Sequence, residues 1–126
     1  MWPGAAEVIT AHDRVLAATG GAPGVRDRGL LESALNRPLG RPLATFDGRP
    51  LYAGPAERVA ALIEALSRNH PFVDGNKRTA MLVGMAVLAA HGHPLATSPE
   101  AVEALAVAVA EGHAGMPELV AWIQQA

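Results

Sequence analysis

The longest apolar run in the sequence, residues 80–90, constrains the fold more than any other feature. The run has 11 residues, and a membrane-spanning helix needs about 20. A helix that is apolar on nearly every side has to be covered by other elements of the protein. We therefore predict that residues 76–90 form the central helix of an all-α bundle, without a membrane span, and that Gly92 ends this helix.

Apolar residues at helical spacing predict five further helices. Val59, Leu62, Ile63 and Leu66, for example, fall at positions i, i+3, i+4 and i+7. Asp27 and Ser98 are suited to accept hydrogen bonds from the first turns of two of these helices. His70 precedes a proline, which disfavours helical backbone and should end the helix before it. The five predicted ranges are 5–19, 27–36, 55–69, 99–111 and the segment from Pro117 onward.

Proline and glycine are spread through residues 37–54, which rules out a long helix there. This segment predicts an extended loop or a small hairpin around Asp47-Gly48. We find no internal repeat and no linker, so residues 1–126 are expected to form one domain.

Composition restricts the classes of partner. The chain has 10 basic and 12 acidic residues and a net charge of −2, which argues against direct nucleic-acid binding. Charged residues make up 17% of the chain, below the roughly 25% of an average domain, so the chain is either tightly packed or leaves apolar surface for a protein partner. Cysteine is absent and the N-terminus lacks the regions of a signal peptide, which is consistent with a cytoplasmic protein.

The turn before the apolar helix, residues 70–78, concentrates side chains suited to phosphate chemistry. The first turn of a helix has free backbone N–H groups and a positive dipole end, which attract anions. Gly75 allows close approach of the backbone, Asn76 adds an amide, and Lys77 and Arg78 add positive charge. We expect these four residues to bind phosphate oxygens.

Two further residues of this turn supply acid–base and metal chemistry. A carboxylate beside a phosphate site is suited to hold Mg²⁺, so Asp74 is the candidate metal ligand. His70 can accept a proton from a hydroxyl at neutral pH. Taken singly, each feature has an ordinary explanation: a capping histidine, an Asp-Gly turn, or a solvated pair of cations. Together they are the parts needed to transfer a phosphorus centre to a hydroxyl.

Other polar residues have structural explanations in the sequence. His12, in the helix over 5–19, should form a hydrogen bond to another helix, and the alternative is that it orients a neighbouring group. Arg26 and Arg28 should hold the second helix to the core. His91 and His93 are expected to mark a helix end instead of a metal pair.

At residues 70–78 the sequence resembles the Fic/Doc superfamily, and within it the Doc (death-on-curing) branch of toxins. The Fic pattern is HxFx(D/E)GNGRxxR, and the Doc-like form has Lys in place of the second Gly, as Lys77 does here. A second region is also similar to that branch and comprises His12-Asp13, Gly20-Gly21, residues 24–27 and residues 30–35.

This resemblance implies a bundle of six or seven helices. It also implies that the segment before the third helix, which includes Leu51-Tyr52, is a flap that aligns a segment of the target protein. It implies that His70 is the general base on a Ser or Thr hydroxyl and that Asp74 holds Mg²⁺. It also implies that Gly75, Asn76, Lys77 and Arg78 bind the phosphates of ATP. Arg68, two residues before the histidine, is a weaker candidate for contact with phosphate or target.

Two positions distinguish the possible reactions within the superfamily. Fic enzymes that transfer AMP have a small residue at position 77 and an arginine at position 81, whereas this chain has Lys77 and Met81. The Doc-like pattern implies transfer of the γ-phosphate to a translation factor, with elongation factor Tu as the expected target, and an arrest of translation. The alternatives are AMP transfer by the same residues and a non-catalytic binding module.

The resemblance also has implications for regulation. Many Fic proteins carry an inhibitory helix with the signature (S/T)xxxE(G/N). Glu111-Gly112 matches the end of this signature, but its first position is Val107. We therefore expect a separate antitoxin of the Phd type, bound as a helix in an apolar groove.

Overall fold

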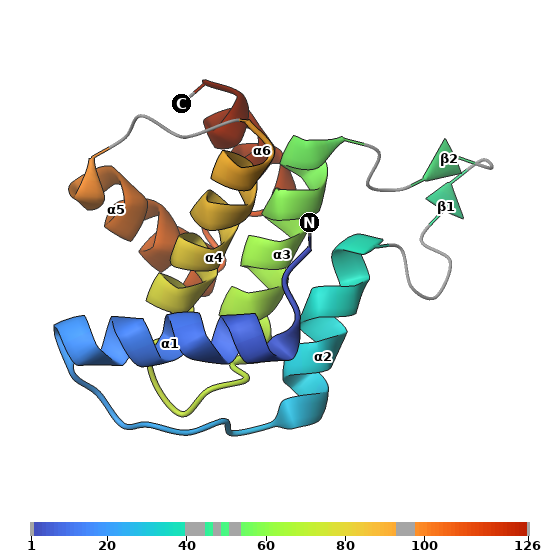
Figure 1. Cartoon of the computed structure of the whole chain (residues 1–126). Helices are drawn as coiled ribbons and strands as arrows, with labels where there is room; N and C mark the ends of the chain where they lie inside the picture. Colours follow the sequence, from blue (N-terminus) through green and yellow to red (C-terminus); the bar gives the residue numbers. More distant parts are fainter. Residues whose placement is uncertain (1, 40–44, 47–48, 51–53, 93–97, 126) are drawn as a thin grey trace.

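The computed structural model describes residues 2–39, 45–46, 49–50, 54–92 and 98–125. Within these ranges it has six α-helices, one 3₁₀ helix and two very short strands (Figure 1). The predicted all-α fold is confirmed. The elements are α1 (Ala5–Thr19), α2 (Arg28–Asn36), η1 (Arg37–Leu39), β1 (Thr45–Phe46), β2 (Arg49–Pro50), α3 (Pro55–Asn69), α4 (Asn76–Ala90), α5 (Pro99–Ala110) and α6 (Met116–Gln125).

The helix boundaries follow the capping residues of the sequence. Asp27 Oδ1 accepts a hydrogen bond from the N–H of Leu30 at 3.0 Å, and Ser98 Oγ accepts one from Ala101 at 3.1 Å. Pro55 occupies the first turn of α3, where its missing N–H leaves no bond unmade. Both predicted capping residues are confirmed, and α2 begins one residue later than predicted because Asp27 lies outside the helix.

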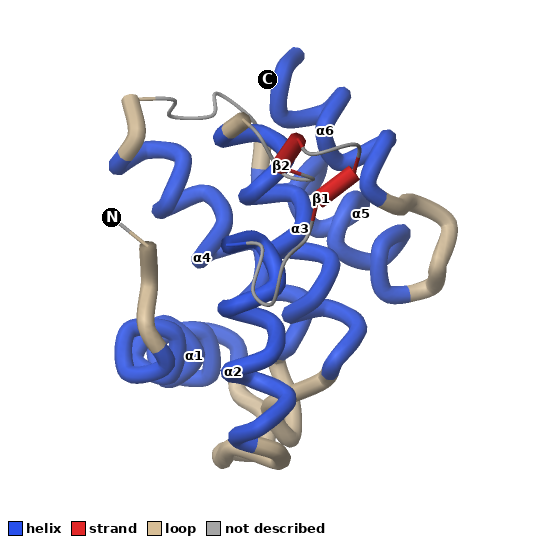
Figure 2. Tube along the Cα trace, turned by 90° about the vertical axis from the view of Figure 1, so that its right-hand side faces the viewer, coloured by secondary structure: helices blue, strands red, loops and turns tan. Residues whose placement is uncertain are grey.

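Helix α3, and not α4 as predicted, is the central helix of the bundle. It packs against α2, α4, α5 and α6, and α1 crosses α4 (Figures 1 and 2). Every residue from Val59 to Ser67 is buried, whereas Leu82 on α4 keeps 41% of its surface exposed. The buried Glu64 of α3 is paired with Arg37 Nη2 at 2.8 Å. Because this pair compensates the buried charge, α3 can lie at the centre although it contains a glutamate on a buried face. The largest fully buried apolar side chains are Phe72, Leu31, Leu62, Ile63, Leu66, Met81, Leu88 and Leu119.

The segment between α2 and α3 contains the predicted hairpin. Strands β1 and β2 pair in antiparallel register, with Thr45 opposite Pro50 and Phe46 opposite Arg49. The predicted turn at Asp47-Gly48, the flap residues Leu51-Tyr52 and His93 lie outside the described residues.

None of the helices in the described part of the chain is long and apolar enough to cross a membrane.

Candidate active site

The turn between α3 and α4 begins at His70, which has left-handed backbone dihedral angles (φ 49°, ψ 56°). Among the described residues other than glycine, it is the only one with a positive φ, a conformation that costs a non-glycine residue on the order of 1 kcal/mol. Arg26 supports this conformation. Its Nε donates to the carbonyl of His70 at 2.7 Å, and its Nη2 donates to the carbonyl of Asn69 at 2.9 Å. Arg26 therefore caps the C-terminus of α3 and holds the candidate base, a role that differs from the predicted attachment of α2 to the core.

The backbone between α1 and α2 runs along the turn and pairs with it (Figure 1). Val25 and Phe72 form an isolated antiparallel bridge. The N–H groups of Arg26 and Asp27 both donate to the carbonyl of Pro71, at 2.7 and 3.1 Å. These contacts satisfy backbone groups that a turn would otherwise leave to water. The first part of the turn is thus held by a segment that lies more than 40 residues earlier in the chain.

The Asn76 side chain forms two hydrogen bonds with the backbone of the turn. The N–H of Phe72 donates to Asn76 Oδ1, and Asn76 Nδ2 donates to the carbonyl of Phe72, both at 2.9 Å. The side chain is 7% exposed, and the Asn76 Nδ2 and His70 Nδ1 atoms lie 3.5 Å apart. Because the amide is committed to Phe72, a contact between Asn76 and an anion would come from its backbone N–H at the start of α4.

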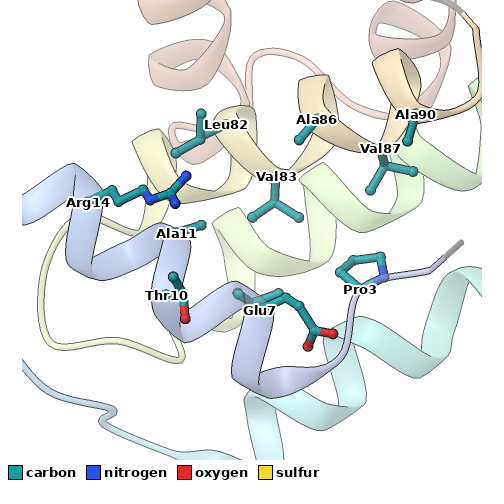
Figure 3. Close-up of a pocket in the computed structure, with 11 residues that line it drawn as sticks. Pro3, Glu7, Thr10, Ala11, Arg14, Leu82, Val83, Ala86, Val87 and Ala90 are labelled. Atoms are coloured by element: carbon teal, nitrogen blue, oxygen red, sulfur yellow. The ribbon is translucent and has the colours of Figure 1, made fainter.

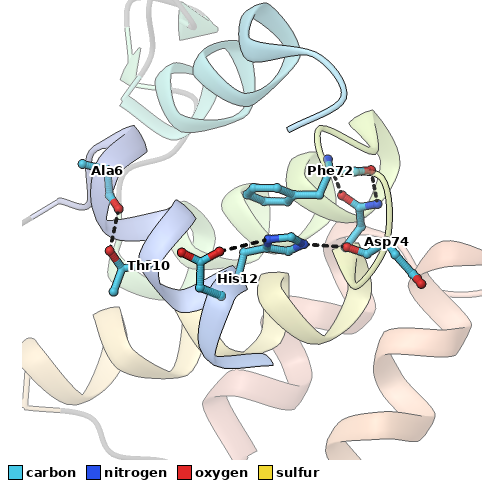
Figure 4. A network of polar contacts seen from close by, with 7 residues as sticks. Ala6, Thr10, His12, Phe72 and Asp74 are labelled. Atoms are coloured by element: carbon cyan, nitrogen blue, oxygen red, sulfur yellow. Dashed lines mark hydrogen bonds and ion pairs between the residues drawn. The ribbon is translucent and has the colours of Figure 1, made fainter. Parts of the chain in front are cut away.

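Helix α1 reaches the turn through His12 (Figure 4). The His12 ring is stacked on Phe72, with ring centroids 3.9 Å apart and planes inclined by 7°, and both residues are 1% exposed. His12 Nε2 lies 2.7 Å from the carbonyl oxygen of Asp74. The bond joins α1 to the turn, so the predicted hydrogen bond from His12 to another helix is wrong in its partner.

Six of the seven predicted site residues line a cavity of about 540 Å³. Gly75, with φ of 77°, is the N-cap of α4, so the free N–H groups of that helix face the cavity. Arg68 is exposed and does not line it. The lining also includes residues that we did not predict, namely Thr19, Gly20 and Gly21 at the end of α1. The complete lining is Thr19, Gly20, Gly21, His70, Val73, Asp74, Gly75, Asn76, Lys77 and Arg78.

The Asp74 carboxylate is exposed and faces this cavity. Its Oδ1 accepts a hydrogen bond from the N–H of Gly75 at 2.9 Å, and its Oδ2 lies 3.4 Å from the N–H of Ala22. A Cβ on Gly21 would come within 2.8 Å of Oδ2, so this glycine leaves room for the carboxylate. No cluster of three or more His, Asp or Glu residues suited to a metal ion occurs in the described part of the chain. The single hard carboxylate fits Mg²⁺ that takes its other ligands from phosphate and water.

The two cations of the motif differ in their surroundings. Lys77 is exposed at the cavity. Arg78 Nη2 lies 3.0 Å from Glu103 Oε1 of α5, and the two side chains are 52% and 61% exposed. No pattern in the sequence indicates this pair, because it depends on how α5 packs beside α4. A phosphate that binds Arg78 has to compete with Glu103.

A second hollow, of about 330 Å³, lies between α1 and α4, away from the motif (Figure 3). Its floor is apolar and includes Val8, Ala11, Leu82 and Val83, with Arg14 among the polar lining residues.

Comparisons with known proteins indicate the family of this chain. The model of the Fic/DOC family matches residues 2–88. The chain is similar to the protein named Toxin Doc of Mycolicibacterium smegmatis, with 44% identity over 79 residues, which is 63% of this chain and 58% of that protein. It is also similar to Protein kinase doc of Escherichia phage P1, with 34% identity over 106 residues, which is 84% of this chain and 79% of that protein. The matched part of the chain therefore spans less than two thirds of the mycobacterial relative.

Proposed function

The chain belongs to the Fic/DOC family, and on that premise we propose that it is the toxin of a toxin–antitoxin system and transfers the γ-phosphate of ATP to a protein hydroxyl. The observation that carries this proposal is the shared cavity. A histidine, an exposed carboxylate and the cationic N-terminus of a helix face the same space. The names of the two relatives, a toxin and a protein kinase, support the class of reaction.

In this proposal each residue has a stated task. The His70 imidazole accepts the proton of a Ser or Thr hydroxyl as that oxygen attacks the γ-phosphorus of ATP. The bond between this phosphorus and the bridging oxygen breaks, and ADP leaves with the electron pair. The N–H groups at the start of α4, together with Lys77 and Arg78, bind phosphate oxygens and stabilise their charge. Asp74 would hold Mg²⁺, which supplies neutralisation of the phosphate charge when bound. Because the transfer of a phosphoryl group depends mainly on positioning and charge, no covalent enzyme intermediate is required.

The choice of the γ-phosphate over AMP rests on positions 77 and 81. Lys77 lines the cavity at the position where the Fic pattern has a small residue, glycine. At position 81, where the Fic pattern has its second arginine, this chain has Met81. Met81 is 1% exposed and contributes to the core, so this position offers no positive charge to a phosphate. Transfer of AMP by the same residues is the second candidate.

Intact-mass spectrometry distinguishes the two reactions. The chain is incubated with ATP, Mg²⁺ and elongation factor Tu, which we propose as the target. A mass gain of one phosphate on the factor is expected, and a gain of one AMP would refute the kinase proposal. His70→Ala should abolish the gain, whereas His113→Ala, at an exposed histidine outside the cavity, should leave it unchanged. If His70→Ala retains full toxicity in cells, the non-catalytic binding module is the better explanation.

We also propose that a separate antitoxin of the Phd type controls the toxin. The apolar hollow between α1 and α4 offers its segment a surface where Leu82 is exposed. The wild-type chain expressed alone should arrest growth, and co-expression of the cognate antitoxin should relieve the arrest. A chain that is harmless when expressed alone would contradict the toxin proposal.

A further inference from the structure

We propose that His12 is a positioning residue for this reaction, which places the Asp74 carboxylate by binding the Asp74 backbone carbonyl from α1. The inference rests on the proposed function, because it concerns the residue that would hold Mg²⁺. It adds to the site a residue that lies 62 positions before Asp74 in the chain and outside the nine-residue motif.

The burial of His12 requires a partner. The residue is 1% exposed, and a polar group removed from water without a hydrogen bond destabilises the fold. Nε2 meets this requirement with the Asp74 carbonyl oxygen at 2.7 Å. Since a carbonyl only accepts, Nε2 carries the proton and donates it. Nδ1 lies 4.0 Å from Asp13 Oδ1, too far for a hydrogen bond, so this bond to the turn is the directional contact of the ring.

The stacking on Phe72 gives α1 a second point of attachment two residues earlier in the turn. The His12 ring also lies close to Gly75, where an added Cβ would be 3.7 Å from His12 Cδ2. The imidazole therefore contacts the turn at Phe72 and at the Asp74 carbonyl, and it lies beside Gly75. This arrangement fixes the backbone of Asp74 more firmly than its own exposed side chain could.

Positioning of this backbone matters because the other restraints on the carboxylate are weaker or local. Its Oδ1 accepts one N–H bond from the neighbouring Gly75, and that donor moves with the same turn. Its Oδ2 accepts from the N–H of Ala22 only at 3.4 Å, which is long for such a bond. A shift of a catalytic group by about 1 Å can lower a rate by about a hundredfold. The hydrogen bond from His12 is therefore expected to affect turnover as well as stability.

Two substitutions at His12 separate the donor from the bulk of the side chain. His12→Gln keeps an Nε2 donor at a similar reach, and His12→Leu keeps apolar volume but removes the donor. Ile9→Ala is the matched control, because Ile9 lies on the same helix, packs against the core and lines neither the cavity at the turn nor the hollow between α1 and α4. All three variants are assayed at a temperature where circular dichroism shows them to be folded.

We expect His12→Leu to lower kcat by about tenfold to a hundredfold with little change in the KM for the protein substrate. His12→Gln should recover most of this loss, and Ile9→Ala should keep the wild-type kcat. Hydrogen exchange of the peptide covering residues 70–78 should be faster in His12→Leu than in the other two variants.

The inference is overturned if kcat of His12→Leu stays within twofold of the Ile9→Ala value, whatever the exchange shows. It is also overturned if His12→Gln is as impaired as His12→Leu, because the donor would then not be the cause. A wild-type chain that transfers neither phosphate nor AMP contradicts the proposed function. In that case hydrogen exchange alone decides whether His12 places the turn, and equal exchange in the three variants rejects it.

Discussion

Replacement of Glu103 by glutamine tests whether α5 restrains the phosphate site. In the structure the Arg78 guanidinium is paired with Glu103 at 3.0 Å, so a nucleotide bound as proposed would have to displace this carboxylate. The glutamine side chain would have nearly the same shape and no charge. We expect Glu103→Gln to bind nucleotide more tightly than the wild-type chain.

The size of the effect follows from exposure. Both side chains are more than half exposed, and ion pairs of this kind contribute about 0.2–1 kcal/mol. The affinity should therefore rise by at most about fivefold, since 1.4 kcal/mol corresponds to a factor of ten. The free energy of unfolding should fall by less than about 1 kcal/mol for the same reason.

Isothermal titration calorimetry with a non-hydrolysable ATP analogue and Mg²⁺ measures this change. Glu111→Gln is the matched control, because it removes the same charge from the end of α5, eight residues later. That distance is about 12 Å along a helix, beyond the screening length of roughly 8 Å at physiological salt. Weaker binding by Glu103→Gln would refute the competition argument and make Glu103 part of the ligand site. An equal gain in Glu111→Gln would attribute the effect to net charge.

Two further predictions concern the turn and the packing beneath it. Asn76→Ala should lower the free energy of unfolding by about 2–4 kcal/mol in urea titrations, because it leaves the buried N–H and carbonyl of Phe72 without partners; the exposed Asn36→Ala is the control and should change it by less than about 0.5 kcal/mol. Gly84→Ala should also destabilise, because its Cβ would lie 2.6 Å from Ile63 Cγ1, which a stiff β-branched side chain cannot easily move. The expected overpacking of about 1–3 kcal/mol exceeds the gain of roughly 1 kcal/mol from replacing a helical glycine, and a more stable variant would show that α3 and α4 can separate without loss.

The local part of the structure could be predicted from the sequence. Helix periodicity and the capping residues Asp27 and Ser98 defined the helices to within a residue or two, because these signals act over a single turn. The central position of α3 was not predicted. Burial of Glu64 depends on an arginine 27 residues away, and periodicity alone assigns Glu64 to the surface.

The sequence named most of the residues that line the candidate site, but it did not predict the hydrogen bonds that hold the turn in place. The nine-residue motif and the helix N-terminus identify the cavity, and six of the seven predicted residues line it. The sequence does not show that the Asn76 amide turns inward or that Arg26 caps α3, because both depend on the path of the backbone. One signal was present for His12: an imidazole on the apolar face of a helix needs a buried partner, although the pattern does not say which one.

The attachment of the turn to α1 and to the segment after it has a consequence for the order of folding. Helices α3 and α4 and the turn that joins them are local in sequence, so they can form early and on their own. The contacts that shape the turn join residues 44 and 62 positions apart, and they require closure of long loops. We therefore expect the turn to take its final shape only after the N-terminal helix has docked, although all nine residues of the motif are already present in the chain.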